Sequence, residues 1–144
     1  MNDLDVRAYV YDVTMQSGRA PSIAEIARHF DAAGADVAES LQRIAAGRAL
    51  VLQRSSSEIL MVPPFSAIVT PFAVQSGGVS YYGNCIWDAL GVPAMLRRDA
   101  EIRTSCGDCG TEMNVRVENG EVHGDGLIHF ALPPTQWWND VVFT

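Results

Sequence analysis

The chain has 144 residues, 48% of them hydrophobic and 19% charged, a balance typical of one globular domain or two small ones that share a core. Its net charge of −7 argues against non-specific binding of nucleic acid. No apolar run approaches the roughly 20 residues that cross a bilayer, and the acidic first five residues do not resemble a signal peptide. We therefore expect a cytoplasmic protein without a membrane partner, in which the three cysteines are free thiols or metal ligands.

The first part of the chain is predicted to form three short helices. Mostly apolar residues over 4–16 indicate the first helix. Ser22 and Glu25 have the spacing of a capping box and begin the second helix. Apolar residues recur at helical spacing within residues 35–46, which predicts the third.

A β-hairpin is predicted next, from apolar residues 50–52 and 59–62 on either side of a polar turn. Three helices followed by a hairpin is the order of a winged helix, which suggests DNA binding. Residues 1–62 carry eight acidic residues against six arginines, and Arg43 is the one arginine of the helix that would enter the major groove. Such a helix needs several phosphate and base contacts. We expect a winged-helix-like packing module, with nucleic acid an unlikely partner.

Residues 63–144 are predicted to be rich in short strands. A turn at Gly77-Gly78 and an Asn119-Gly120 hairpin signal separate some of them. The expected strands are residues 68–70, 72–74, 100–106, 112–118, 121–123 and 126–132, residues 79–82 lead into a helix, and residues 141–144 are also strand-like. The predicted fold class is therefore α+β: a winged-helix-like module over residues 1–62, then a small mixed or antiparallel sheet with one packed helix over residues 63–144.

That packed helix is expected to begin around Cys85 and to be interrupted at Gly91 and Pro93. Asn84 is a good N-cap, which would put Cys85 at the first helical position, where the helix dipole favours the thiolate. Asp88 follows three residues later on the same helix face. A soft nucleophile beside a proton carrier predicts chemistry, although a buried cysteine beside a solvated aspartate remains the simpler alternative.

Cys106 and Cys109 form a C-x-x-C pair, and His123 and His129 follow at a spacing that superficially resembles a zinc finger. The histidines of such a finger lie on a helix, whereas these fall in a glycine-rich, strand-like segment. Two alternatives are a tight turn in which the glycines matter more than the thiols, and a pair of soft thiols that binds a thiophilic metal.

Several of these segments together resemble the alkylmercury lyase (organomercurial lyase) family. They are residues 64–67, 70–72, 82–91, 105–110, 129–130 and 137–140. The resemblance implies cleavage of a carbon–mercury bond by protonolysis, carried out by two cysteines and an aspartate without an organic cofactor. By position, Cys85 resembles the first catalytic cysteine and Asp88 the catalytic aspartate. The substrate would be a small organomercurial, and free thiols would remove the mercuric ion product.

The resemblance places the second catalytic cysteine at or just after residues 141–144, and the sequence reaches Thr144 without it. Cys106 and Cys109 are the other cysteines, but they are not at the matching position. We therefore carry forward a lyase that acts through Cys85 and Asp88. The alternative is a catalytically impaired homologue that binds thiophilic metal through Cys85, with Cys106 and Cys109 as further metal ligands. A winged-helix transcriptional regulator is the least favoured.

Overall fold

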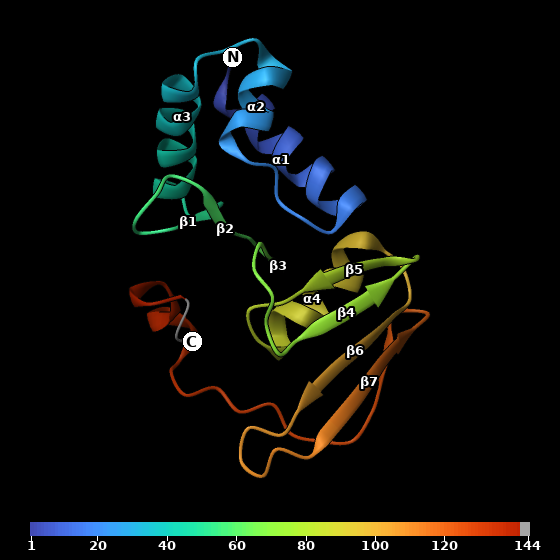
Figure 1. The fold of residues 1–144 in the computed structure, drawn as a ribbon. Helices are drawn as coiled ribbons and strands as arrows, with labels where there is room; N and C mark the ends of the chain where they lie inside the picture. The colour runs from blue at the N-terminus through green and yellow to red at the C-terminus, as the bar shows by residue number, and fades with distance from the viewer. Residues whose placement is uncertain (142–144) are drawn as a thin grey trace.

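The computed structural model describes residues 1–141, which form an α+β fold (Figure 1). The helices and strands of its N-terminal part follow the predicted order. They are α1 (Asp3–Ser17), α2 (Ile23–Phe30), α3 (Gly34–Ala46), β1 (Val51–Leu52) and β2 (Ile59–Val62). Ser22 and Glu25 form the predicted capping box at the start of α2. Among residues 1–141, no helix is both long and apolar enough to cross a membrane.

Two antiparallel sheets complete the fold. The first joins β1, β2 and β3 (Phe65–Ser66) in that order. The second has the strand order β5-β4-β6-β7-β8 and consists of β4 (Ala73–Ser76), β5 (Val79–Tyr82), β6 (Ala100–Ser105), β7 (Glu112–Glu118) and β8 (Glu121–His123). Helix α4 (Ile86–Leu96) contacts β3, β4 and β6. The last element, the 3-10 helix η1 (Pro134–Asn139), lies apart from the second sheet in Figure 1.

One hydrophobic cluster connects the helical part to the second sheet. It contains Val10 of α1, Leu41 of α3 and Ile102 of β6, all fully buried. The Tyr81 hydroxyl on β5 also donates a hydrogen bond of 2.6 Å to the Met15 backbone oxygen. The division of the chain after residue 62 remains a prediction, but the pairing of β3 with β2 crosses that boundary.

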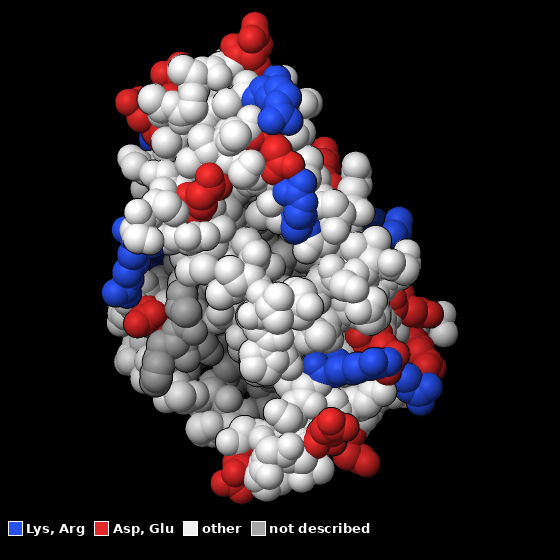
Figure 2. Space-filling model, in the orientation of Figure 1, with Lys and Arg blue, Asp and Glu red and all other residues white. Residues whose placement is uncertain are grey.

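The charged side chains give α3 little free positive charge. Arg43 donates from Nε and Nη2 to the two carboxylate oxygens of Asp3, both at 2.9 Å. The two hydrogen bonds, with a third from Ser40, lower the pKa of Asp3 to about 2. Figure 2 shows acidic and basic side chains interspersed on one face of the molecule. The winged-helix assignment stays a prediction.

Two predicted strands are absent from the structure. Residues 68–70 do not pair, because the Ser66 hydroxyl donates to the Ile68 oxygen and accepts from the Ile68 amide, which turns the chain away from the sheet. Residues 126–132 form no strand, and Leu127 is fully exposed. The predicted strand over residues 141–144 lies largely outside the described residues, and its first residue, Val141, is in a turn.

The prediction that Gly91 and Pro93 interrupt the fourth helix is wrong. Helix α4 runs through both residues to Leu96. Pro93 removes one backbone hydrogen bond, but its ring is buried with Val92, so tertiary packing outweighs the lost bond. Gly91 lies against Pro64 so closely that an added Cβ would be 2.9 Å from the Pro64 Cβ. The glycine therefore serves helix packing and does not end the helix.

Candidate functional site: a thiol and a carboxyl at the start of α4

Cys85 is the N-cap of α4, whereas the sequence predicted it to be the first helical residue, so the helix begins one residue later than predicted. Its backbone is extended, with φ −143° and ψ −179°, and its backbone oxygen accepts from the Ala89 amide at 2.9 Å. The prediction that Asn84 caps the helix is wrong, because the chain pairs beyond β5 before it turns: the Gly83 amide donates to the Phe72 oxygen at 3.0 Å. Asn84 instead donates from Nδ2 to the Val141 backbone oxygen at 3.1 Å.

Gly83 allows the turn into α4 to be this tight. A Cβ at this position would lie 2.5 Å from the Ala89 nitrogen and 2.9 Å from the Cys85 oxygen. Both are backbone atoms of the first helical turn, so neither can move aside without disturbing the helix start. The Thr70 hydroxyl also donates to the Gly83 oxygen, which fixes the turn from the other side. The position of Cys85 is therefore set by backbone packing.

The Cys85 thiol faces the carboxyl group of Asp88, as the sequence predicted. The thiol donates toward Oδ2, with 3.8 Å between Sγ and Oδ2, and both side chains are half-buried. The prediction of a favoured thiolate is wrong for the free protein. Burial raises the pKa of Cys85, and the neighbouring Asp88 charge raises it further, against the opposing effect of hydrogen bonds from the Asp88 and Trp87 amides.

Asp88 also holds its proton more readily than an ordinary aspartate. Burial raises its pKa, while hydrogen bonds from the Cys85 thiol and from the Asn84 and Cys85 amides act in the opposite direction. Two groups with raised pKa values therefore share one short turn. The pair can store a proton and pass it between sulfur and oxygen, which is the property expected of a general acid beside a nucleophile.

Three aromatic rings lie beside this turn, and sequence reasoning did not bring them together. Trp87, the residue before Asp88, packs edge-on against Phe130, with ring centroids 5.9 Å apart. Phe130 in turn packs against Trp137 at 5.1 Å. No periodic pattern links these residues, because the contact depends on the path of the chain after β8. The residues themselves belong to segments that resemble the family, which was the one available signal.

Cys106 and Cys109 lie together on the turn between β6 and β7. Cys109 is exposed, and its Sγ is 3.1 Å from the Thr111 hydroxyl oxygen. Hydrogen bonds from Thr111, and from the side chain of Cys106, lower the pKa of Cys109 to about 7. Within residues 1–141, no three His, Cys, Asp or Glu side chains are placed to share a metal ion, so His123 and His129 do not complete a zinc site with this pair.

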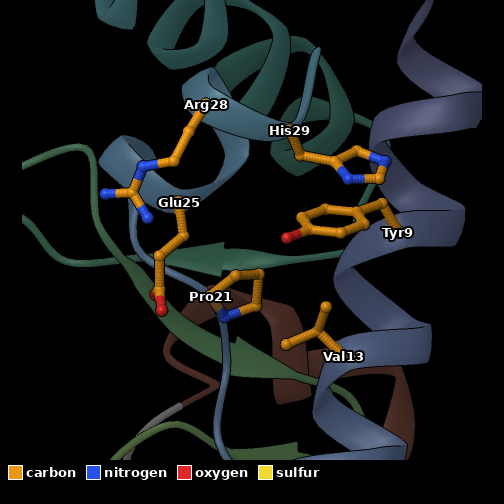
Figure 3. Close-up of a pocket in the computed structure, with 6 residues that line it drawn as sticks. All are labelled: Tyr9, Val13, Pro21, Glu25, Arg28 and His29. Atoms are coloured by element: carbon orange, nitrogen blue, oxygen red, sulfur yellow. The ribbon is translucent and has the colours of Figure 1, made fainter. Parts of the chain in front are cut away.

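A separate cavity of about 390 Å³ lies between α1 and α2 (Figure 3). Tyr9 and His29 stack there with ring centroids 3.9 Å apart, and Glu25 and Arg28 complete its polar side. Glu25 is already paired with Arg19 and with the α2 capping box. The cavity lining contains no thiol, and we assign the chemistry of the chain to Cys85 and Asp88 instead.

Comparisons with known proteins bear on the fold and on the family of the chain. A solved structure described as the mercury-bound form of MerB2 superimposes with a TM-score of 0.63 at 18% sequence identity, over 83% of this chain and 58% of that one. The present chain thus spans less than two thirds of that protein. No curated protein matches the chain. The family model for MerB, alkylmercury lyase, matches residues 65–144, which is more than half of the chain and includes Cys85 and Asp88. The chain belongs to the alkylmercury lyase family.

Proposed function

We propose that this protein cleaves carbon–mercury bonds of small organomercurials, with Cys85 as the mercury-binding thiol and Asp88 as the proton carrier. The observation that carries the proposal is the contact of 3.8 Å between Cys85 Sγ and Asp88 Oδ2 at the start of α4. Membership of the family supports the reaction type. The half-buried setting supports the roles, because a carboxyl with a raised pKa accepts a proton from the thiol more readily than an ordinary aspartate and can then donate it.

The reaction begins when the Cys85 sulfur displaces a labile ligand from the mercury atom. Sulfur is a soft ligand that suits a soft metal. The thiol proton moves to Asp88, toward which it already points. Asp88 is then a neutral carboxylic acid beside an alkyl- or arylmercury thiolate.

Cleavage follows when Asp88 returns that proton to the carbon bound to mercury. The carbon–mercury electron pair forms the new carbon–hydrogen bond, so the hydrocarbon leaves and mercuric ion stays on sulfur. Thiolate ligation makes the carbon more basic and favours this step. No electrons are gained or lost overall, and the reaction needs no organic cofactor. Free thiols then remove the mercuric ion by ligand exchange.

A protein that binds mercury without turnover is the second candidate. Cys106 and Cys109 lie on the β6–β7 turn, and neither is at the position where the family resemblance places a second catalytic thiol. That position falls after Val141, beyond the described residues. Such a protein would bind mercury through Cys85 without releasing hydrocarbon.

Release of benzene from phenylmercuric acetate in excess free thiol tests the proposal. Wild type should release many equivalents, and Cys85→Ser should release none although serine can still cap the helix. Asp88→Asn should also lose turnover. Asp5→Asn is the matched control, because Asp5 occupies the equivalent third helical position of α1, where it is exposed. Mercury retained without benzene would reject the lyase in favour of a binding protein.

A further inference from the structure

The turn between β6 and β7 presents two thiols that the proposed lyase reaction does not use. The Cys106 amide donates to the Thr111 oxygen at 2.8 Å, and the Gly110 amide donates to the Cys106 oxygen at 2.9 Å. These bonds close a tight loop over residues 107–110. The loop holds Cys106 at its start and Cys109 three residues later, and the side chain of Cys106 is one of the groups that lower the pKa of Cys109. Both thiols are free, and Cys109 is open to solvent.

The number of ligands selects the kind of metal. Structural zinc takes four protein ligands in a tetrahedral arrangement. Within the described part of the chain no third or fourth His, Cys, Asp or Glu joins this pair. Mercuric ion is a soft ion that two thiolates satisfy in a near-linear arrangement. We propose that Cys106 and Cys109 form a two-thiolate binding site for mercuric ion, separate from Cys85.

Binding at this site is a ligand exchange. The two protein sulfurs each form a bond to mercury, and two small thiolates or chlorides leave. The protons of the protein thiols pass to the displaced thiolates or to solvent. Nothing is oxidised or reduced, and no further reactant is needed.

Cys106 and Cys109 follow a strand that ends on the same side of the second sheet as the strand that leads to Cys85. Ala73 on β4 pairs with Tyr82 on one side and with Arg103 on the other. Strands β5 and β6 therefore run in the same direction on either side of β4. Tyr82, which ends β5, and Arg103 lie roughly 10 Å apart across two strand spacings, and β6 continues for two more residues. Figure 1 shows β5 and β6 finishing at the same end of the sheet. Cys85 follows the end of β5 by three residues, and Cys106 directly follows β6.

Mercuric ion can reach this pair from solution or from Cys85. The second route rests on the proposed function, whereas binding itself does not. A dithiol that takes the ion from Cys85 would leave that thiol free for another substrate molecule. A chelating pair also competes with monothiols better than a single cysteine does, because the second sulfur binds at a high effective concentration.

The test uses the full chain with Cys85→Ser, so that Cys106 and Cys109 are the remaining thiols. Mercuric chloride is added to the reduced protein in a large excess of glutathione. Mercury retained after desalting is measured by mass spectrometry, and sulfur–mercury absorption is read in the ultraviolet. We expect one mercury per chain. Adding Cys109→Ser or, separately, Cys106→Ser should lower retention at least about tenfold.

Two controls make the result specific. Ser105→Ala in the same background alters the neighbouring residue without removing a thiol, and it should retain one mercury per chain. Zinc chloride should be lost on desalting with a chelator. Circular dichroism checks that each variant is folded, and the exposed Cys109 is the safer site to change. Equal retention with and without Cys109, or zinc held as firmly as mercury, would overturn the proposal.

The same experiment separates this site from the lyase. If Cys85→Ser holds mercury while wild type releases no benzene, the dithiol site stands and the proposed function fails. If wild type turns over but Cys85→Ser holds no mercury against glutathione, the lyase stands and the dithiol site fails.

Discussion

Asn84 Nδ2 donates a hydrogen bond to the backbone oxygen of Val141 at 3.1 Å, across 57 residues of sequence. This bond ties the end of the described chain to the turn that carries Cys85. The aromatic contacts from Phe130 to Trp87 and Trp137 run along the same side. The segment after β8 therefore packs against Asn84 and Trp87, the residues that directly precede Cys85 and Asp88, although it belongs to no sheet.

Asn84→Ala should loosen the packing of this segment without unfolding the chain. We expect faster amide exchange over residues 134–141 and a several-fold loss of benzene release, because the organic group loses part of its surroundings. Hydrogen exchange read by mass spectrometry measures the first effect. Asn114→Ala is the control, since Asn114 bonds to the exposed Glu101 on the sheet. Unchanged exchange over residues 134–141 in Asn84→Ala would show that the bond holds nothing in place.

The ionised carboxylate of Asp88 should lower the stability of the folded chain at pH 8. Burial raises its pKa in the folded state, so folding favours the protonated form. The penalty for ionisation is absent below the unfolded pKa of about 4 and appears as the pH rises through the folded pKa. Asp88→Asn should therefore melt above wild type at pH 8, and this advantage should vanish toward pH 4.

The matched control for that melting experiment is Asp5→Asn. Asp5 is exposed in the first turn of α1, where a carboxylate interacts favourably with the helix dipole, typically by about 0.3–1 kcal/mol. Its replacement should lower or leave unchanged the melting temperature at pH 8. A wild type that melts above Asp88→Asn at pH 8 would contradict the assigned burial cost.

Gly83→Ala should damage fold and site together. The new methyl group would meet the Ala89 nitrogen at 2.5 Å and the Cys85 oxygen at 2.9 Å, and both are backbone atoms. We expect a loss of more than about 2 kcal/mol in the free energy of unfolding, measured in urea. Gly107→Ala meets nothing within 4 Å and serves as the control. Equal unfolding midpoints for the two variants would refute the close approach.

Local sequence rules predicted the helices of the N-terminal part, and for clear reasons. Apolar spacing and the Ser22–Glu25 capping box act within a few residues, and both appear in the structure. The prediction of a hairpin turn at Asn119-Gly120 is confirmed for the same reason: strand β7 ends at Glu118 and β8 begins at Glu121. The contact between the Cys85 and Asp88 side chains was predictable because their spacing at the start of one helix is also local.

The sequence predictions were wrong where contacts with residues distant in the sequence determine the local structure. Pro93 stays within α4 because its ring is buried, which no local propensity shows. The thiolate prediction for Cys85 considered the helix dipole but not burial, and burial determines the direction of the pKa shift. The approach of Phe130 to Trp87 depends on the chain path after β8, where the sequence predicted a strand.

The thiols should differ in reactivity toward iodoacetamide. The pKa of Cys109 is about 7, so roughly half of it is thiolate at neutral pH, whereas burial and Asp88 keep Cys85 protonated. We expect Cys109 to be alkylated first and Cys85 much more slowly. Peptide mass spectrometry over time gives both rates, and the urea-unfolded chain, in which the two rates should converge, is the control. Faster labelling of Cys85 in the folded chain would mean that its thiolate is favoured after all.

The most direct measurement is a single turnover of phenylmercury on a chain in which Cys85 is the one remaining thiol. Cys106→Ser and Cys109→Ser provide that background, with and without Asp88→Asn. Both proteins should bind one equivalent of phenylmercury, and only the one that keeps Asp88 should release benzene. Equal benzene release from both would contradict the role of Asp88 as the proton carrier, and no binding by either would contradict the role of Cys85.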